Sequence, residues 1–158
     1  MTPKHIIEAE KNWRFGRLGV VGYLLYENLP ANQRPSWAAG ILQLGCTVVA
    51  QTPKELQTLI DISREPSAWR EAKPAFRAIR LLTLSAFRAE PEAESMGSRL
   101  LYLAESTAKV IYNASGEEGP FDSDAGWWVP QRAVELVQKA GDHLYGHLWD
   151  ALIWPWHT

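Results

Sequence analysis

The sequence has little cysteine and no long apolar run. Cys46 is the only cysteine among 158 residues, which excludes an intrachain disulfide and fits a reducing compartment. No stretch reaches the roughly 18 consecutive apolar residues that a membrane-spanning helix needs. The N-terminal segment carries charges every few positions and lacks the apolar core of a signal peptide. We therefore expect a cytoplasmic protein with no membrane partner.

Sequence motifs for catalysis and nucleotide binding are also missing. There is no Gly-x-Ser-x-Gly motif for an activated serine, and no glycine-rich loop ends in Lys-Ser or Lys-Thr. Gly16, Gly19 and Gly22 do not have the dinucleotide-binding spacing, so close packing explains them better. With a net charge of −2, the chain has no overall attraction to nucleic acid.

Helix signals dominate what is present. Apolar residues make up 46% of the chain and recur at spacings of three and four, which is the period of an amphipathic helix. Helices would begin at Pro3, Pro53, Pro74 and Pro130, and residues 98–113 give the clearest helical period. We predict an all-α bundle of six or seven helices in a single domain over residues 1–158.

Two local features refine this prediction. The three glycines named above each cost about 1 kcal/mol in a helix interior, so the first helix breaks, bends or packs closely there. A short strand between Gly16 and Leu25 is the alternative. Thr52 and Glu55 match a capping box, which predicts that a helix begins beside Pro53.

Charge is unevenly distributed along the chain. Residues 1–89 carry 12 Lys and Arg against 7 Asp and Glu, whereas residues 90–158 carry 4 against 11, giving +5 and −7. Residues 89–95 form a predicted acidic connector between two helices. The simplest consequence is electrostatic complementarity between parts that pack together, at about 0.2–1 kcal/mol for each exposed pair.

A basic face is predicted on the helix that follows Pro74. Arg77, Arg80 and Arg88 share this face and could grip the phosphates of a nucleic acid. Because the whole chain is not basic, we favour pairing of these arginines with the acidic 90–124 region of the same chain. Nucleic-acid binding is therefore the third of three functional hypotheses.

The most unusual segment is the glycine-rich loop of residues 113–128. It combines flexible glycines, four carboxylates and three large aromatic side chains, a composition typical of an ordered lid or a binding loop. Asp122 and Asp124 are similar to the start of a calcium loop, but the twelfth residue is Ala133 instead of glutamate. The aromatic residues either fasten the loop to the core or bind a partner. The candidate binding residues are Tyr112, Asn113, Phe121, Asp122, Asp124, Trp127 and Trp128.

One side of the predicted 98–113 helix is polar. Its members are Ser98, Tyr102, Glu105, Lys109, Tyr112 and Asn113. We favour a solvent-exposed face on which Glu105 and Lys109 form an i, i+4 pair worth about 0.2–0.5 kcal/mol. If this side lines a cleft instead, Glu105 is the candidate catalytic base of an enzyme.

Two histidines and an aspartate near the C-terminus could bind a metal. His143, His147 and Asp150 fall in the last predicted helix at spacings that place them on one face. Imidazole and carboxylate groups suit a divalent transition metal. Further ligands would come from Glu105, His5 or His157. Histidines without a metal explain the same short pattern and are our preferred interpretation.

Eight tryptophans make the chain rich in residues that anchor interfaces. Trp154 and Trp156 lie so near the C-terminus that we expect them at a homodimer or partner interface. The leading hypothesis is a non-enzymatic helical binding protein that uses the 113–128 loop on a protein partner or small ligand. The alternative is a metal-dependent enzyme with His143, His147 and Asp150 as ligands.

Overall fold

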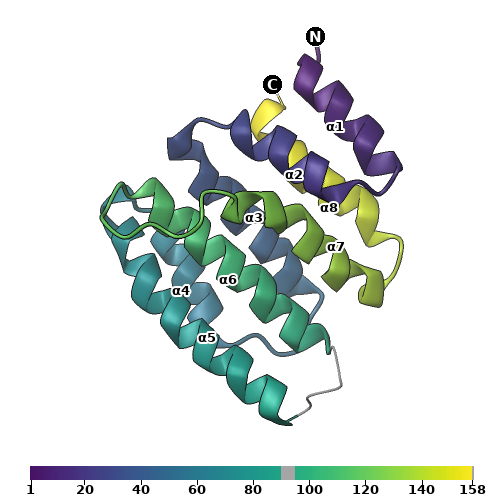
Figure 1. The fold of residues 1–158 in the computed structure, drawn as a ribbon. Coiled ribbons are helices and arrows are strands. Elements are labelled where there is room, and N and C mark those ends of the chain that lie inside the picture. The colour runs from purple at the N-terminus through teal and green to yellow at the C-terminus, as the bar shows by residue number, and fades with distance from the viewer. Residues whose placement is uncertain (90–94, 158) are drawn as a thin grey trace.

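The computed structural model describes residues 1–89 and 95–157, in which all regular structure is helical (Figure 1). The α-helices are α1 (Lys4–Arg14), α2 (Leu18–Glu27), α3 (Arg34–Thr47), α4 (Lys54–Ser63), α5 (Ala72–Ala89), α6 (Met96–Ala114), α7 (Trp128–Ala140) and α8 (Leu144–Ile153). The 3-10 helices are η1 (Ala31–Gln33), η2 (Pro66–Glu71), η3 (Ala125–Trp127) and η4 (Trp154–Trp156). The predicted all-α class is confirmed. Most of the predicted acidic connector, residues 90–94, lies outside the described residues.

The described chain has eight α-helices where six or seven were predicted, because the first predicted helix divides. Gly16 adopts φ +71, a left-handed conformation that favours glycine, and it separates α1 from α2. The stretch that was a candidate strand is therefore helical from Leu18 onward. None of the described helices has both the length and the apolar character needed to cross a membrane.

Two helices begin directly after a proline rather than at one. Pro3 and Pro53 have extended backbones and precede α1 and α4 without a side-chain cap. The predicted capping box of Thr52 and Glu55 is therefore wrong. The Thr52 hydroxyl instead donates to the carbonyl oxygen of Cys46 at 3.4 Å, at the end of the preceding helix.

Other helix starts follow the sequence more closely. Pro74 and Pro130 lie in the first turns of α5 and α7, where a backbone N–H has no intrahelical acceptor to lose. Ser95 caps α6, because its hydroxyl accepts a hydrogen bond from the Ser98 amide at 3.1 Å. Ser95 therefore marks the N-terminus of α6.

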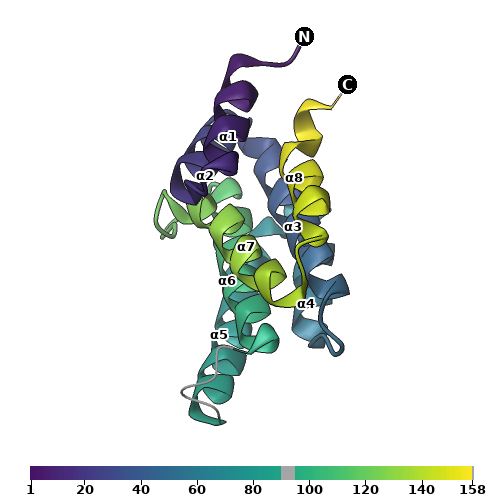
Figure 2. The ribbon, with the colours of Figure 1, turned by 90° about the vertical axis from the view of Figure 1, so that its right-hand side faces the viewer.

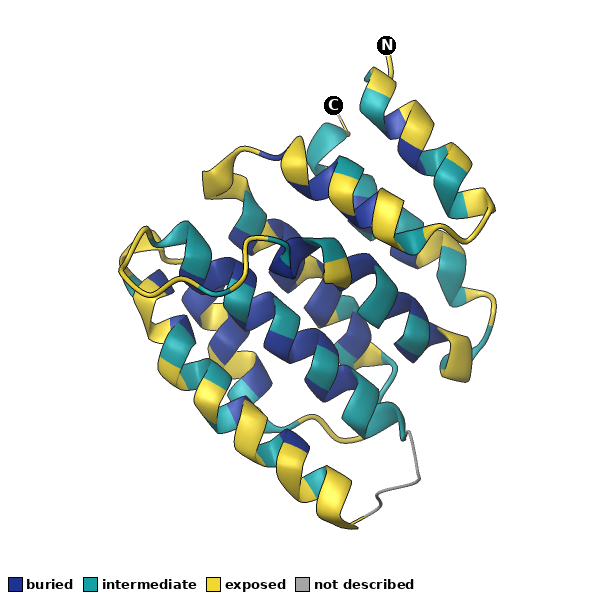
Figure 3. Cartoon of the chain, in the orientation of Figure 1, coloured by how far each residue is buried: buried dark blue, intermediate teal, exposed yellow. Residues whose placement is uncertain are grey.

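The helices form two layers (Figure 2). Helices α5, α6 and α7 lie in one layer, with α1 and α2 continuing it at one end, and α4, α3 and α8 form the other. Helix α6 packs on α5, α3 and α7, so that it is buried along most of its length (Figure 3). Its fully buried apolar side chains include Leu100, Leu103 and Ile111.

Aromatic contacts hold the two chain ends together. Trp13 of α1 lies 5.9 Å from the ring of Tyr145 and 5.4 Å from that of Trp149, both on α8. His5 meets the edge of Trp156 with a centroid separation of 5.1 Å. Both termini consequently lie at the same end of the molecule (Figure 1).

Candidate functional site

Glu105 lies near the middle of α6 and is buried, with 7% of its surface exposed. Its Oε1 accepts a hydrogen bond from Arg80 Nη1 at 3.0 Å, and its Oε2 accepts one from the Thr83 hydroxyl at 2.6 Å. The predicted solvent-exposed face is therefore wrong, because α5 covers this side of α6. Both carboxylate oxygens are engaged, which is the arrangement of an ion pair that joins two helices.

Lys109 does not form the predicted pair with Glu105. Its Nζ lies 5.5 Å from the centre of the Phe76 ring and 5.9 Å from that of Phe121. A cation over an aromatic face at this distance contributes about 0.5–1 kcal/mol. Lys109 therefore faces the start of α5 and the 113–128 loop.

Tyr112 and Asn113, at the end of α6, bind the backbone of the loop that follows. Asn113 Nδ2 donates to the carbonyl oxygens of Phe121 at 3.1 Å and Asp122 at 3.2 Å. Its Oδ1 accepts from the Phe121 amide at 2.7 Å. The Tyr112 hydroxyl donates to the Glu118 carbonyl oxygen at 2.5 Å. These side chains use their polar groups to shape the loop.

Phe121 fastens the first half of the loop to the helices. Its ring centre lies 4.8 Å from that of Phe76 and 5.6 Å from that of Tyr112. Lys73 Nζ lies 4.8 Å from the Tyr112 ring centre and donates to the Gly119 carbonyl oxygen at 2.7 Å. Gly119 adopts φ +70 at this turn. Side chains from α5 and α6 therefore hold the loop in one conformation.

Trp127 fastens the other end of the loop to α2. Its indole Nε1 donates to Glu27 Oε1 at 2.8 Å, and its ring meets Tyr23 edge-on at a centroid distance of 5.1 Å. A Cβ atom on Gly22 would overlap the Trp127 carbonyl oxygen. The glycine therefore permits this close contact between α2 and η3.

Trp128 differs from its neighbour because 45% of its surface is exposed. It borders a small polar hollow with a volume of about 130 Å³. The hollow is lined by Ser106, Lys109, Asp122, Asp124, Ala125, Trp128 and Arg132. Three of the seven predicted binding residues, Asp122, Asp124 and Trp128, therefore meet here. The other four, described above, hold the loop in place.

The charged side chains around this hollow differ in whether they have partners within the protein. The Arg132 guanidinium lies 5.6 Å from the centre of the Trp128 ring and pairs with Glu135 Oε2 at 3.3 Å. The Lys109 ammonium group lies against the Phe76 and Phe121 rings, as described above. The carboxylates of Asp122 and Asp124 form no hydrogen bond or ion pair with the described part of the chain. The hollow therefore combines two carboxylates that have no partner among the described residues, two cations that have other partners, and an exposed indole.

The three candidate metal ligands lie at the start of α8 and within it. His143 precedes α8, which begins at Leu144, whereas His147 and Asp150 lie within the helix. All three side chains are exposed. Within residues 1–89 and 95–157, no three His, Cys, Asp or Glu side chains are grouped so that they could hold a metal ion.

One arginine on the basic face of α5 forms an ion pair within the protein. Arg80 pairs with Glu105, so the predicted pairing with the 90–124 region is confirmed for this arginine. Arg77 and Arg88 are exposed on the outer side of α5, together with the apolar side chain of Leu81. Nothing described in the structure covers this outer face.

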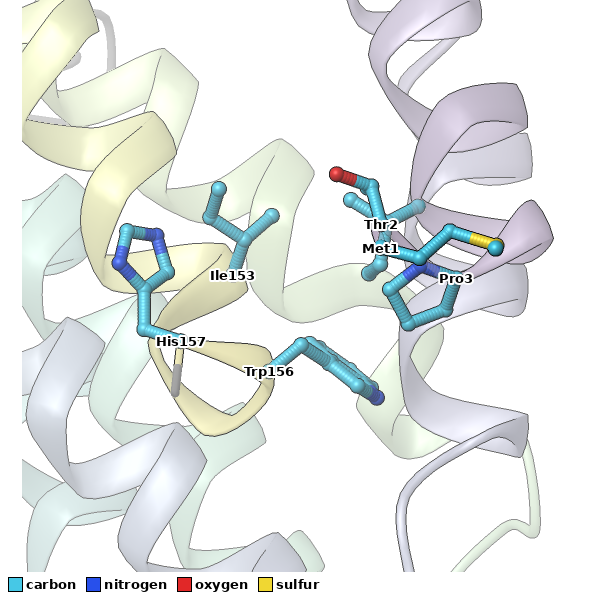
Figure 4. Close-up of a pocket in the computed structure, with 7 residues that line it drawn as sticks. Met1, Thr2, Pro3, Ile153, Trp156 and His157 are labelled. Atoms are coloured by element: carbon cyan, nitrogen blue, oxygen red, sulfur yellow. The ribbon is translucent and has the colours of Figure 1, made fainter.

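Two larger cavities flank the C-terminal segment. One, of about 320 Å³, separates Met1, Thr2 and Pro3 from Ile153, Trp156 and His157 (Figure 4). The other, of about 300 Å³, lies between α3 and the end of α8. Trp154 and Trp156, which we expected at an interface, each line one of these cavities. Neither cavity includes a residue of the 113–128 loop.

Burial shifts the pKa of three side chains, all toward the neutral form. It lowers the pKa of His5 and raises that of the Cys46 thiol, which is half-buried at the edge of the core. It also raises the pKa of Tyr26, although Arg34, 4.1 Å from the ring centre, acts in the opposite direction. These three groups are therefore not activated as charged nucleophiles or acids at neutral pH.

Ser106 and Arg132 line the hollow but were not among the predicted site residues. Arg132 follows Trp128 by four residues on α7, so helical spacing alone places them on one face. That signal was present in the sequence. The contact between Trp127 and Glu27 spans 100 residues of sequence and has no comparable local signal.

No family model, no curated protein and no solved structure matches this chain. Its function is therefore inferred from the contacts, burial and charge of its own residues. Among the predicted sites, only the 113–128 loop combines an ordered backbone with an exposed aromatic ring and free charge.

Proposed function

We propose that the protein is a non-enzymatic binding module whose hollow beside Trp128 holds a basic side chain of a protein partner. The observation that carries the proposal is the exposed Trp128 ring beside two free carboxylates, Asp122 and Asp124. An arginine or lysine of the partner would pack against the exposed part of the indole, beside Arg132, and reach these carboxylates with its charged end.

The size of the hollow favours a protein partner over a small molecule. Pockets for drug-sized ligands usually measure about 300–1,000 Å³. The hollow measures about 130 Å³, which suits the end of one side chain. The rest of the binding energy would come from contacts around it, as is usual where one tryptophan anchors a larger interface.

The fixed conformation of the loop also supports binding. Asn113 makes three hydrogen bonds to the loop backbone, and Trp127 fastens its end to α2. A loop that is already ordered loses little conformational entropy when a partner binds. The side chains that hold the loop thereby keep Asp122, Asp124 and Trp128 in place.

A peptide selection tests this proposal. The purified full chain is screened against a displayed library of random peptides, and the dissociation constants of enriched peptides are measured by calorimetry. We expect enrichment of arginine or lysine, and about tenfold or greater weakening in Trp128→Ala, which corresponds to about 1.4 kcal/mol. Asp124→Asn should weaken binding and reduce its salt dependence.

Trp154→Ala is the control, because it removes a ring of the same size that is also exposed and lies far from the loop in sequence. Its affinity for the selected peptides should equal that of the unaltered protein. Peptides that bind Trp128→Ala as tightly as the unaltered protein would contradict the proposal. A selection that enriches no peptide would contradict it as well.

A further inference from the structure

The cavity between α3 and the end of α8 has aromatic walls and a volume of about 300 Å³. Its lining residues are Gln33, Ser36, Trp37, Gly40, Ala151, Trp154 and Pro155. Trp37 is buried, and its Nε1 donates to the Leu152 carbonyl oxygen at 2.9 Å, so its polar group is already used. Trp154 leaves 71% of its surface exposed at the cavity, which is unusual for so large an apolar side chain.

No charged side chain belongs to this lining. The polar members are Gln33 and Ser36, and the Ser36 hydroxyl donates to the Gln33 carbonyl oxygen at 3.1 Å. The hollow beside Trp128, by contrast, is bordered by four charged groups. Because a charge would lose its hydration here without gaining an opposite charge, the cavity is complementary to a neutral molecule.

Gly40 keeps the cavity open. It lies in the interior of α3, where glycine is the least favourable residue after proline. A Cβ atom at Gly40 would have nothing within 4 Å, so packing does not require glycine at this position. Gly45 of the same helix differs, since its Cβ would lie 3.0 Å from a methyl group of Leu136. Any side chain larger than alanine at Gly40 would project toward the space that the cavity now provides.

We propose that this cavity binds a neutral planar aromatic molecule of one or two rings. An engineered apolar cavity of about 150 Å³ is large enough to bind benzene, and this cavity has about twice that volume. The Trp154 ring supplies a flat apolar surface against which another ring packs favourably, and Trp37, which is only 3% exposed, lines the inner side of the cavity. This site shares no residue with the hollow beside Trp128, so it is independent of the proposed protein partner.

Titration with 2-naphthol, followed by nuclear magnetic resonance of the full ¹⁵N-labelled chain, tests the proposal. We expect saturable shifts at the Gly40 amide and the Trp154 indole N–H. Gly40→Leu should fill the cavity and weaken binding about tenfold or more without lowering the thermal midpoint. Naphthalene-2-sulfonate, which has the same rings and a charge, should bind at least about fivefold more weakly.

Gly146→Leu is the matched control, because Gly146 is an exposed helical glycine on α8 with nothing within 4 Å of its Cβ. It should bind 2-naphthol as the unaltered protein does. Shifts that do not saturate, or equal affinity in Gly40→Leu, would overturn the proposal. A concentration-dependent dimer that Trp154→Ala abolishes would also overturn it, by assigning the cavity to a second copy of the chain.

Discussion

Trp127 and Trp128 are neighbours in the sequence and have opposite surroundings in the structure. The Trp127 indole donates to Glu27 and packs on Tyr23, so it joins the loop to α2. The Trp128 ring is partly exposed beside Asp122 and other charged groups. The two side chains thus show that one loop can be fixed on one side and open on the other.

The same division extends along the loop. Tyr112 and Asn113 direct their polar groups to the loop backbone, and Phe121 packs on Phe76. Asp122 and Asp124 leave their carboxylates free. Residues that hold the loop and residues that could bind a partner therefore alternate within a few positions, so composition alone cannot separate them.

The largest expected effect comes from breaking the fixed side at Gly22. Gly22→Ala would place a methyl group on the Trp127 carbonyl oxygen, so α2 and η3 must move apart. We expect a loss of about 3 kcal/mol in the free energy of unfolding, measured by denaturant titration. Gly19→Ala is the control, because its Cβ has open space and should stabilise α2 by up to about 1 kcal/mol. Equal stabilities of the two variants would contradict the close contact.

A smaller effect is expected from loosening the loop at Asn113. Asn113→Ala removes three hydrogen bonds to the backbone of Phe121 and Asp122, which should lower the free energy of unfolding by about 2 kcal/mol. Amide hydrogen exchange in the loop should become faster. Asn28→Ala, which removes one bond from an exposed side chain to Leu24, should have almost no effect. Unchanged exchange in Asn113→Ala would show that other contacts hold the loop.

The polar link between α5 and α6 at Glu105 should respond more weakly. Glu105→Gln keeps the shape of the side chain and removes the charge that Arg80 and Thr83 bind. Because the Arg80 side chain is half-exposed, we expect a loss of only about 1 kcal/mol. Glu10→Gln, in an exposed pair with Arg14, should change stability by less than about 0.5 kcal/mol. A catalytic role for Glu105 would require an activity that this substitution abolishes.

The smallest expected effect lies far from the loop, at His5. Burial lowers its pKa, so the unfolded chain binds a proton more readily as the pH falls through the ordinary value of about 6.5. This contribution to stability is present above that pH and is lost below it. Denaturant titrations between pH 7 and pH 5 should show the decrease in the unaltered protein and in His147→Phe. The decrease in the free energy of unfolding should be smaller in His5→Phe. If His5→Phe loses as much stability between pH 7 and pH 5 as the unaltered protein, other groups cause the decrease.

Much of the fold could be predicted from local sequence, because helical period and proline position act within a few residues. The 98–113 period corresponds to α6, and Pro74 and Pro130 mark the first turns of α5 and α7. The division at Gly16 was one of the options that its glycines allowed. The exposure of polar residues on α6 could not be predicted, because α5, which covers Glu105, is a tertiary neighbour.

The candidate site divides in the same way. Composition selected the 113–128 loop, and Asp122, Asp124 and Trp128 lie together at its hollow. The partners that fix the loop come from distant parts of the chain, Glu27 for Trp127 and Lys73 for Gly119. Sequence spacing cannot identify such pairs.

The most direct test of this account is a paired denaturant titration of Trp127→Ala and Trp128→Ala. Trp127→Ala removes a hydrogen bond to Glu27 and the packing on Tyr23, so its free energy of unfolding should fall by about 2–3 kcal/mol. Trp128→Ala removes a partly exposed ring, so its free energy of unfolding should stay within about 1 kcal/mol of the unaltered protein. Equal losses in the two variants, or a larger loss in Trp128→Ala, would contradict the division between a fixed and an open side of the loop.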